Sequence, residues 1–270
     1  MQLTILGTAT PYPVPGNACS GYLLQGGGAS IWIDAGTGTL AELQRHTPIE
    51  TLDAIFISHR HADHAADLFV AYYALKFSAL RPRAKIRVIG PEALADRMAD
   101  FLGPDALQGL HEVFEFTEMN GWADAVVGDL TLSWGPVAHG VPAFALTVTG
   151  PASAAIGGID GIGGIEESTT KRTSTFTYSG DTAPCISLVE MAEESTVLLC
   201  EAGYAREALG ENAVHHTPED AGRTATAAGV GTVILTHIAD DLDVADAARR
   251  VGAHFAGEIV IATPGNTYPI

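Results

Sequence analysis

Short apolar runs and amphipathic segments alternate along the whole chain, and Gly, Pro and Asn separate them. The apolar runs predict strands at 2–7, 21–25, 30–34, 52–57, 85–90, 130–139, 143–149, 174–178, 196–200, 231–236, 259–262 and 266–269. Helical patterns are expected at 38–46, 65–75, 91–102, 185–194, 218–228 and 243–256, and Pro91 would lie in the first turn of the third. Residues 103–129 are less regular. Strands and helices mix in both halves, which indicates an α/β fold.

The length and composition bound the organisation of this fold. At 270 residues and 47% hydrophobic residues, the chain has room for one large domain or two small ones with a sizeable core. Segment 150–171 is rich in glycine, has the composition of a mobile loop, and would join halves of about 1–150 and 172–270. No apolar run is long enough to span a membrane, no leader precedes the first strand, and three cysteines form no disulfide framework. We therefore expect a cytoplasmic protein.

The charge limits the partners. The net charge is −18, from 14 Lys plus Arg and 32 Asp plus Glu. Nucleic-acid binding draws most of its sequence-independent affinity from Lys and Arg contacts to phosphates. Nucleic acid is therefore an unfavourable partner, although it is not excluded, and bound metal ions would still admit a small phosphate ester.

The stretch from Ser58 to His64 places four metal-binding side chains close together: His59, His61, Asp63 and His64. It follows an apolar strand and precedes a helix. Alternate residues of an extended loop point the same way, so His59 and His61 can share one ion, while Asp63 and His64 lie at the start of the helix. This spacing predicts two ions side by side; the alternative is a polar turn with scattered core histidines.

Other polar residues stand where predicted strands end, namely Asp34, His139, Asp181, Glu201 and His237. Ligand sites of layered α/β folds gather along one edge of the sheets, so we expect one shared site. Asp34, which glycines follow, is either a plain turn or helix cap or a residue that supports this site. His46, His111 and His254 are expected at the surface.

The order of these motifs resembles the metallo-β-lactamase fold. The matching segments are His59-x-His61-x-Asp63-His64, His139, Ser179-Gly180-Asp181-Thr182 and Thr236-His237, and they span essentially the whole chain. The resemblance implies an αββα sandwich, in which two mixed β-sheets flanked by helices form a single domain over residues 1–270. It also implies two divalent metal ions: His59, His61 and His139 bind one, Asp63, His64 and His237 bind the other, and Asp181 bridges them. Zn²⁺ is favoured, while Mn²⁺ or Fe remain open.

A finer match lies in residues 215–222, His-His-Thr-Pro-Glu-Asp-Ala-Gly, which are similar to a segment of the ribonuclease Z-like branch. The resemblance implies that His215 contacts the scissile phosphate, that Glu201 orients it, and that His216 takes a variable place. A carboxylate beside an imidazole raises its pKa and fixes its tautomer. We therefore expect Asp63, His215 and Glu201 as catalytic residues; the alternative for 215–216 is a plain polar loop.

Two departures from ribonuclease Z bear on the substrate. That enzyme carries a long arm before the bridging aspartate, but here only residues 140–180 fill the interval, with Lys171-Arg172 as the basic element of their glycine-rich part. The corresponding turn of ribonuclease Z has the pattern Asp-x-Gly-Glu-Gly. Segment 34–38 reads Asp-Ala-Gly-Thr-Gly, so the second acidic residue of that turn is missing here. We therefore expect a dinuclear metal phosphodiesterase for small phosphodiesters such as 3′,5′-cyclic nucleotides, as in armless bacterial relatives, and a homodimer. The alternatives are a tRNA 3′-processing endoribonuclease, and a carboxylic-ester, thioester or lactone hydrolase or a non-catalytic nucleotide-binding relative.

Overall fold

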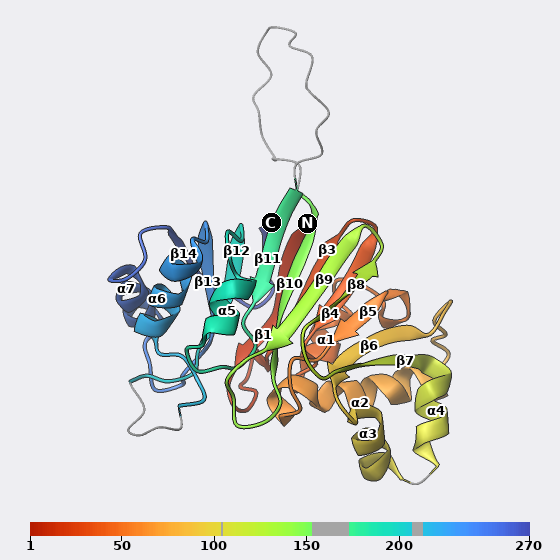
Figure 1. Cartoon of the computed structure of the whole chain (residues 1–270). Coiled ribbons are helices and arrows are strands. Elements are labelled where there is room, and N and C mark those ends of the chain that lie inside the picture. The colour runs from red at the N-terminus through yellow and green to blue at the C-terminus, as the bar shows by residue number, and fades with distance from the viewer. Residues whose placement is uncertain (104, 153–172, 207–212) are drawn as a thin grey trace, which may run out of the picture.

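Two β-sheets face each other, and helices cover the outer face of each (Figure 1). The computed structural model describes residues 1–103, 105–152, 173–206 and 213–270. One apolar cluster fills the space between the sheets and includes Ile5 and Phe56 from the first sheet and Trp134 and Phe176 from the second. The predicted α/β class and the αββα sandwich of two mixed sheets are confirmed.

The first sheet is formed by the first part of the chain and its last strand. The strand order is β15-β1-β3-β4-β5-β6-β7, and β2 pairs with β1. The strands are β1 (Gln2–Ala9), β2 (Ala18–Cys19), β3 (Gly21–Gly26), β4 (Ala29–Ile33), β5 (Ala54–Phe56), β6 (Ile86–Pro91), β7 (Phe114–Met119) and β15 (Thr267–Pro269). Strands β4 to β7 are parallel, whereas β15, β1, β3 and β4 pair antiparallel.

The second sheet has the order β14-β13-β12-β11-β10-β9-β8. Its strands are β8 (Ala123–Val127), β9 (Leu130–Pro136), β10 (Phe144–Pro151), β11 (Thr173–Tyr178), β12 (Val197–Ala202), β13 (Thr232–Ile238) and β14 (Glu258–Ile261). Strands β11 to β14 are parallel, and β8 to β11 pair antiparallel. Parallel neighbours end at a common edge, so each sheet presents a row of strand ends from which loops emerge.

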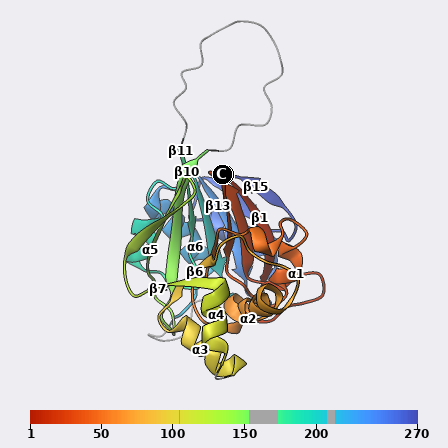
Figure 2. The ribbon, with the colours of Figure 1, turned by 90° about the vertical axis from the view of Figure 1, so that its right-hand side faces the viewer.

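Helices bury one face against the outside of each sheet. The first sheet is covered by α1 (Thr39–Leu43), α2 (Ala62–Phe77), α3 (Leu94–Leu102) and α4 (Ala106–Val113), and the second by α5 (Ile186–Met191), α6 (Pro218–Ala228) and α7 (Val244–Gly252). A short 3₁₀ helix, η1 (Ile49–Thr51), precedes β5. Figure 2 shows α2, α3 and α4 together in front of the first sheet. Within the described residues, every helix is too short or too polar to cross a membrane.

Local turn chemistry explains several of these boundaries. The β3–β4 hairpin turns at Gly27-Gly28, whose φ values of 55° and 75° are the left-handed conformations that a two-residue hairpin loop requires. Helix α6 begins after Thr217, whose side chain accepts a hydrogen bond from the backbone of Asp220 and completes a capping box. Gly229 ends the helix at a φ of 66°. The predicted helix over 218–228 is therefore confirmed.

Two predictions between residues 85 and 129 are wrong. Pro91 ends β6, and the helix begins only at Leu94. Because proline restricts the preceding residue to extended backbone, Gly90 continues the strand. Residues 103–129 contain α4, β7 and β8, and the alternation of apolar and polar residues in β7 is the sequence signal for that strand.

The prediction of a loop from residue 150 to 171 is also wrong at its first residues. Strand β10 includes Gly150 and Pro151, and residues 153–171 lie outside the described residues. We propose that the two halves form a single domain over residues 1–270. The core between the sheets supports this proposal, because it takes Leu3 and Trp134 from the first half and Phe176 and Ile234 from the second.

Gly36 generates a prediction about stability. A Cβ atom on Gly36 would lie 2.0 Å from the carbonyl oxygen of Asp63, and the two segments cannot separate freely because Ala35 donates to the carbonyl of His64 at 2.7 Å. We expect Gly36→Ala to lower the free energy of unfolding in urea by roughly 1–3 kcal/mol, the usual effect of overpacking. In Gly121→Ala nothing lies within 4 Å of the new atom, so this control should stay within about 0.5 kcal/mol of the wild type. Equal stability of the two variants would contradict the prediction.

Candidate metal centre

The predicted metal ligands meet at the sheet edge where parallel strands end. They are His59, His61, Asp63, His64, His139, Asp181 and His237. His59 and His61 lie in the loop after β5, Asp63 and His64 lie in the first turn of α2, and the others lie after β9, after β11 and near the end of β13. The structure divides them into one set of three histidines and a second set of Asp63, His64, Asp181 and His237. Within each set, the donor atoms lie within 4.8 Å of one another.

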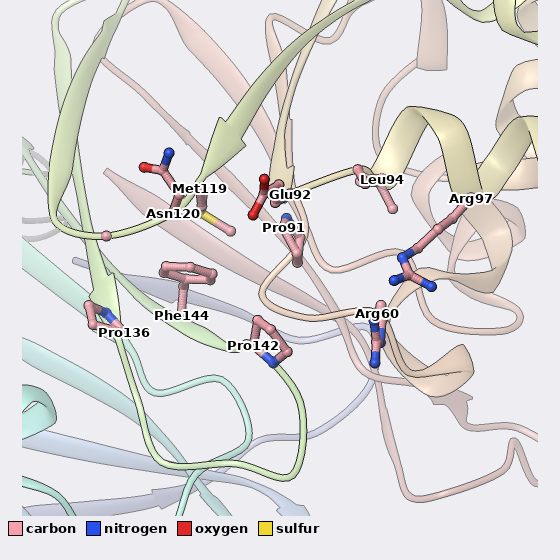
Figure 3. A pocket seen from close by; sticks show the side chains of 12 residues that line it. Arg60, Pro91, Glu92, Leu94, Arg97, Met119, Asn120, Pro136, Pro142 and Phe144 are labelled. Atoms are coloured by element: carbon pink, nitrogen blue, oxygen red, sulfur yellow. The ribbon is translucent and has the colours of Figure 1, made fainter.

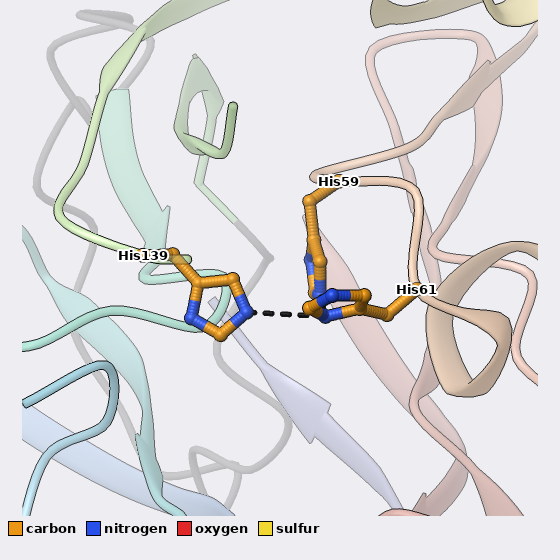
Figure 4. Close-up of side chains that lie close together, drawn as sticks. All are labelled: His59, His61 and His139. Carbon is orange, nitrogen blue, oxygen red and sulfur yellow. Dashed lines mark hydrogen bonds between the residues drawn. The ribbon is translucent and has the colours of Figure 1, made fainter. Parts of the chain in front are cut away.

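Three imidazole nitrogens converge in the first set (Figure 4). Nδ1 of His61 lies 3.0 Å from Nε2 of His59 and 3.1 Å from Nε2 of His139. Nδ1 of His139 donates to the carbonyl oxygen of Val214 at 2.8 Å, so its Nε2 carries a lone pair. Lone pairs that face one another at this distance repel unless a cation lies between them.

The second set surrounds a buried nitrogen. Nε2 of His64 lies 3.3 Å from Oδ2 of Asp181 and 3.6 Å from Oδ2 of Asp63, but it lacks a hydrogen-bond partner among the described residues. Nε2 of His237 is 3.4 Å from the same oxygen of Asp181, which is also 3.7 Å from Nε2 of His59. Asp181 therefore lies between the two sets. A buried polar atom without a partner is unfavourable, and a metal ion at this position would satisfy it.

A fully buried carboxylate, Asp34, supports both sets from behind. It accepts hydrogen bonds of 2.7 Å from the backbone and hydroxyl of Ser58, from Nδ1 of His64 and from the hydroxyl of Tyr178. Because the Ser58 hydroxyl donates to Asp34, its oxygen can accept the Nδ1 proton of His59 at 3.1 Å. In both histidines, Nε2 is then left for a metal ion. Asp34 thus supports the site, and its left-handed φ of 54° is matched by a φ of 47° at His237.

His215 and Glu201 form a pair beside the second set. Nδ1 of His215 donates to Oε1 of Glu201 at 3.0 Å and lies 3.9 Å from Asp181, and its side chain is 19% exposed. Glu201 is fully buried and also accepts from the backbone of Thr182 and of Gly203. Burial lowers the pKa of His215, but the hydrogen bond and charge of Glu201 outweigh burial, so the pKa is raised. The structure therefore brings these two residues together as predicted.

His216 has a structural role, because both of its ring nitrogens are hydrogen-bonded inside the protein. It is fully buried, Nδ1 donates to the carbonyl of Thr182 at 2.6 Å, and Nε2 accepts from the Thr224 hydroxyl at 3.0 Å. It connects α6 to the segment after β11, so residues 215–216 are not a plain polar loop. His46, His111 and His254 are exposed, as predicted.

The electrostatics of most of the ligands favour forms that bind cations. The exceptions are Asp63, whose pKa is raised by burial, and His64, whose pKa burial lowers but Asp181 and Asp34 raise more, so a metal ion would have to displace a proton from each. Burial lowers the pKa of His59 and His61 and lowers that of His237 to about 3, which keeps these imidazoles neutral. Burial raises the pKa of Asp181, but the nearby histidines lower it more, so this carboxyl is ionised. Neutral imidazole and ionised carboxylate are the ligand forms of divalent metals, and the donors therefore fit such ions.

Sequence reasoning missed several residues that orient these ligands. Ser20 places its hydroxyl 2.9 Å from Nδ1 of His237, and Tyr178 reaches Asp34 from the opposite sheet. Val214 contributes only its backbone carbonyl, for which a side-chain pattern gives no signal. The position of Tyr178 directly before the Ser179-Gly180-Asp181 motif was the available signal for that residue.

The comparisons with known proteins agree with this geometry. The Beta-lactamase superfamily domain matches residues 29–238. The uncharacterized protein Rv1339 of Mycobacterium tuberculosis is 28% identical over 274 residues, which cover 100% of this chain and 92% of that protein. The probable metallo-hydrolase YhfI of Bacillus subtilis is 27% identical over 282 residues and 98% of each chain.

Solved structures show the same fold. The crystal structure of YhfI superposes with a TM-score of 0.79 at 23% identity and covers 100% of this chain and 98% of that one. The short form of human tRNase Z gives a TM-score of 0.72 at 20% identity over 99% of this chain and 98% of that one. The chain therefore belongs to the β-lactamase superfamily as a metallo-hydrolase with the metallo-β-lactamase fold, and it resembles the ribonuclease Z-like branch.

Proposed function

We propose that the chain is a dinuclear metal-dependent phosphodiesterase for small phosphodiesters such as 3′,5′-cyclic nucleotides. The position of His215, beside Asp181 and held by Glu201, carries the proposal. Cleavage of a phosphodiester expels an alkoxide, which leaves more readily when an acid protonates it. Because Nδ1 of His215 is bound to Glu201, Nε2 is the atom left to meet the substrate and to donate that proton.

The metal ligands take the following roles in this proposal. His59, His61 and His139 would hold one ion, Asp63, His64 and His237 would hold the other, and Asp181 would serve both. Divalent ions held there would supply Lewis-acid chemistry, which polarises a phosphoryl oxygen and lowers the pKa of water. Asp63, at the surface end of the second set, orients the attacking water, and Asp34 and Glu201 keep the imidazoles in the required tautomers.

The proposal also includes the ion, the assembly and the location. Zn²⁺ is favoured because the donors are imidazoles and carboxylates, and Mn²⁺ or Fe suit the same set. A cytoplasmic location is supported by Cys19, Cys185 and Cys200, all of which are free thiols. A homodimer is carried over from the resemblance to the ribonuclease Z-like branch.

A small substrate is favoured over RNA by the charge. The net charge of −18 leaves few Lys and Arg residues to neutralise a long phosphate backbone. The alternatives are tRNA 3′ processing, in view of the likeness to human tRNase Z, and hydrolysis of a carboxylic ester, which the same Lewis-acid chemistry would serve.

The first prediction for this function is metal-dependent turnover. Protein loaded with Zn²⁺ or Mn²⁺ should hydrolyse bis(p-nitrophenyl) phosphate and cyclic AMP, and a chelator should abolish both reactions. Cleavage of pre-tRNA with a steep dependence on salt would favour the endonuclease instead. If neither phosphodiester is hydrolysed by metal-loaded protein, the proposed function is wrong.

Asp181→Ala tests the shared ligand. Removing the carboxylate between the two sets should lose bound metal and activity together, since both sets depend on it. Metal content after purification is measured by elemental analysis. Asp96→Ala, which removes an exposed carboxylate from α3, should keep both metal and activity. Full metal content in Asp181→Ala would refute the shared role.

His215→Ala tests the proposed general acid. This variant should keep its bound metal but lower kcat for cyclic AMP, whose leaving group is an alkoxide, by roughly 10²–10⁴-fold, the usual contribution of a general acid. Its kcat for bis(p-nitrophenyl) phosphate should change much less, because p-nitrophenolate leaves without a proton. The control is His46→Ala, which removes an exposed histidine that belongs to neither ligand set. Loss of metal from His215→Ala would mean that this residue is a ligand instead.

A further inference from the structure

A cavity of about 470 Å³ lies where β6, β7 and β9 end (Figure 3). It is lined by Arg60, Pro91, Glu92, Ala93, Leu94, Arg97, Met119, Asn120, Gly121, Pro136, Pro142 and Phe144. The cavity adjoins the loop that carries the first ligand set in two places. Arg60 lies between His59 and His61 in the chain, and the backbone of Phe144 donates to the carbonyl of Ser58 at 3.0 Å. A substrate bound at the ligands would therefore have this cavity as its neighbour.

The floor of the cavity is apolar. Pro91, Leu94, Met119 and Phe144 are buried, and each contributes a hydrophobic surface. The exposed residues Pro136 and Pro142 continue this surface at the rim. A floor of this composition packs against the flat or apolar part of a ligand, such as a nucleoside.

Two guanidinium groups lie at the rim. Arg60 comes from the loop that carries the ligands and Arg97 from α3, and Figure 3 shows both guanidiniums directed into the same part of the cavity. Both side chains are exposed, and among the described residues neither forms a hydrogen bond or an ion pair. The carboxylate of Glu92 also lines the cavity but lies beyond ion-pair distance of both. Five other Lys and Arg side chains form ion pairs among the described residues, namely Arg45, Lys76, Arg223, Arg249 and Arg250.

Because neither guanidinium is paired with a carboxylate among the described residues, both are available to an anion in the cavity. Arginine is suited to phosphate because its planar fork donates two parallel hydrogen bonds. A phosphate at the rim would place the group that bears it over the apolar floor. The cavity thus combines an anion site with an apolar wall next to the metal ligands.

We propose that this cavity binds a second phosphate of the substrate, in addition to the scissile diester. The preferred substrates are then nucleotide phosphodiesters that carry a further terminal phosphate, which Arg60 and Arg97 bind while the nucleoside packs on Met119 and Phe144. This inference rests on the proposed function only in placing the scissile diester at the metal ligands.

A matched pair of chromogenic diesters tests the preference. The p-nitrophenyl ester of thymidine 5′-phosphate and the same ester with an added 3′-phosphate differ only in the second anion. Zn²⁺-loaded protein should show a KM roughly 10-fold or more lower for the 3′-phosphorylated ester, the effect of charge-assisted hydrogen bonds. Arg97→Gln should raise that KM by about the same factor, leave kcat nearly unchanged, and leave the unphosphorylated ester unaffected.

The control for Arg97→Gln is Arg83→Gln, which removes an exposed guanidinium outside the cavity and changes the net charge equally. Arg60→Gln is a second variant with the same expected effect on KM. Equal KM values for the two esters in the wild type, or equal behaviour of Arg97→Gln and Arg83→Gln, would overturn the inference and leave the proposed function intact.

Calorimetric titration with thymidine 3′,5′-bisphosphate gives a readout independent of turnover. The full-length wild type should bind it more tightly than thymidine 5′-phosphate, and Arg97→Gln should lose that difference. If neither ester is hydrolysed, the proposed function fails and this titration alone decides the cavity. Equal affinity of the wild type and Arg97→Gln for the bisphosphate would then reject the phosphate site.

Discussion

The arrangement of the metal ligands depends on one buried carboxylate that connects the two sheets. Asp34 at the end of β4 accepts from Ser58 in the loop after β5, from His64 in α2 and from Tyr178 at the end of β11. A buried carboxylate is very unfavourable unless donors surround it, so these contacts specify one relative position of the elements. Through Ser58 and His64, the same group also fixes a tautomer in each ligand set.

Burial and neighbouring charges shift the pKa values of the residues near Asp34 in opposite directions. Burial alone would keep every group near the strand ends neutral, which suits His59 and His237 but not Asp181. Burial raises the pKa of Asp181, but the histidines around it lower it more, and His64, whose own pKa is raised, supplies positive charge there. Nδ1 of His64 is held by Asp34 and Nδ1 of His139 by a backbone carbonyl, so Nε2 of each ring faces the site. The site is therefore arranged for cations before any cation binds.

Much of this could be predicted from the sequence, for identifiable reasons. The cluster from His59 to His64 occupies six positions, so its spacing alone gives its geometry, and the rule that parallel strands end at one edge places Asp181 and His237. Prediction from the sequence failed where contacts between distant segments determine the structure. Pairing with β7 extends β6 as far as Pro91, in addition to the local effect of proline on Gly90, and Val214 acts through a carbonyl. Arg97 is separated from Arg60 by a strand and a helix, so no local pattern brings them together.

The left-handed backbone at Asp34 and His237 has an evolutionary consequence. Such a conformation strains any residue with a Cβ atom, and glycine at either position would relax it while removing a side chain that the site uses. At His237, selection for thermal robustness alone would thus favour a change that dismantles the site, whereas at Asp34 the four hydrogen bonds to the carboxylate oppose such a change. Sequence drift toward glycine at position 237 would mark descendants that have abandoned hydrolysis while keeping the sandwich.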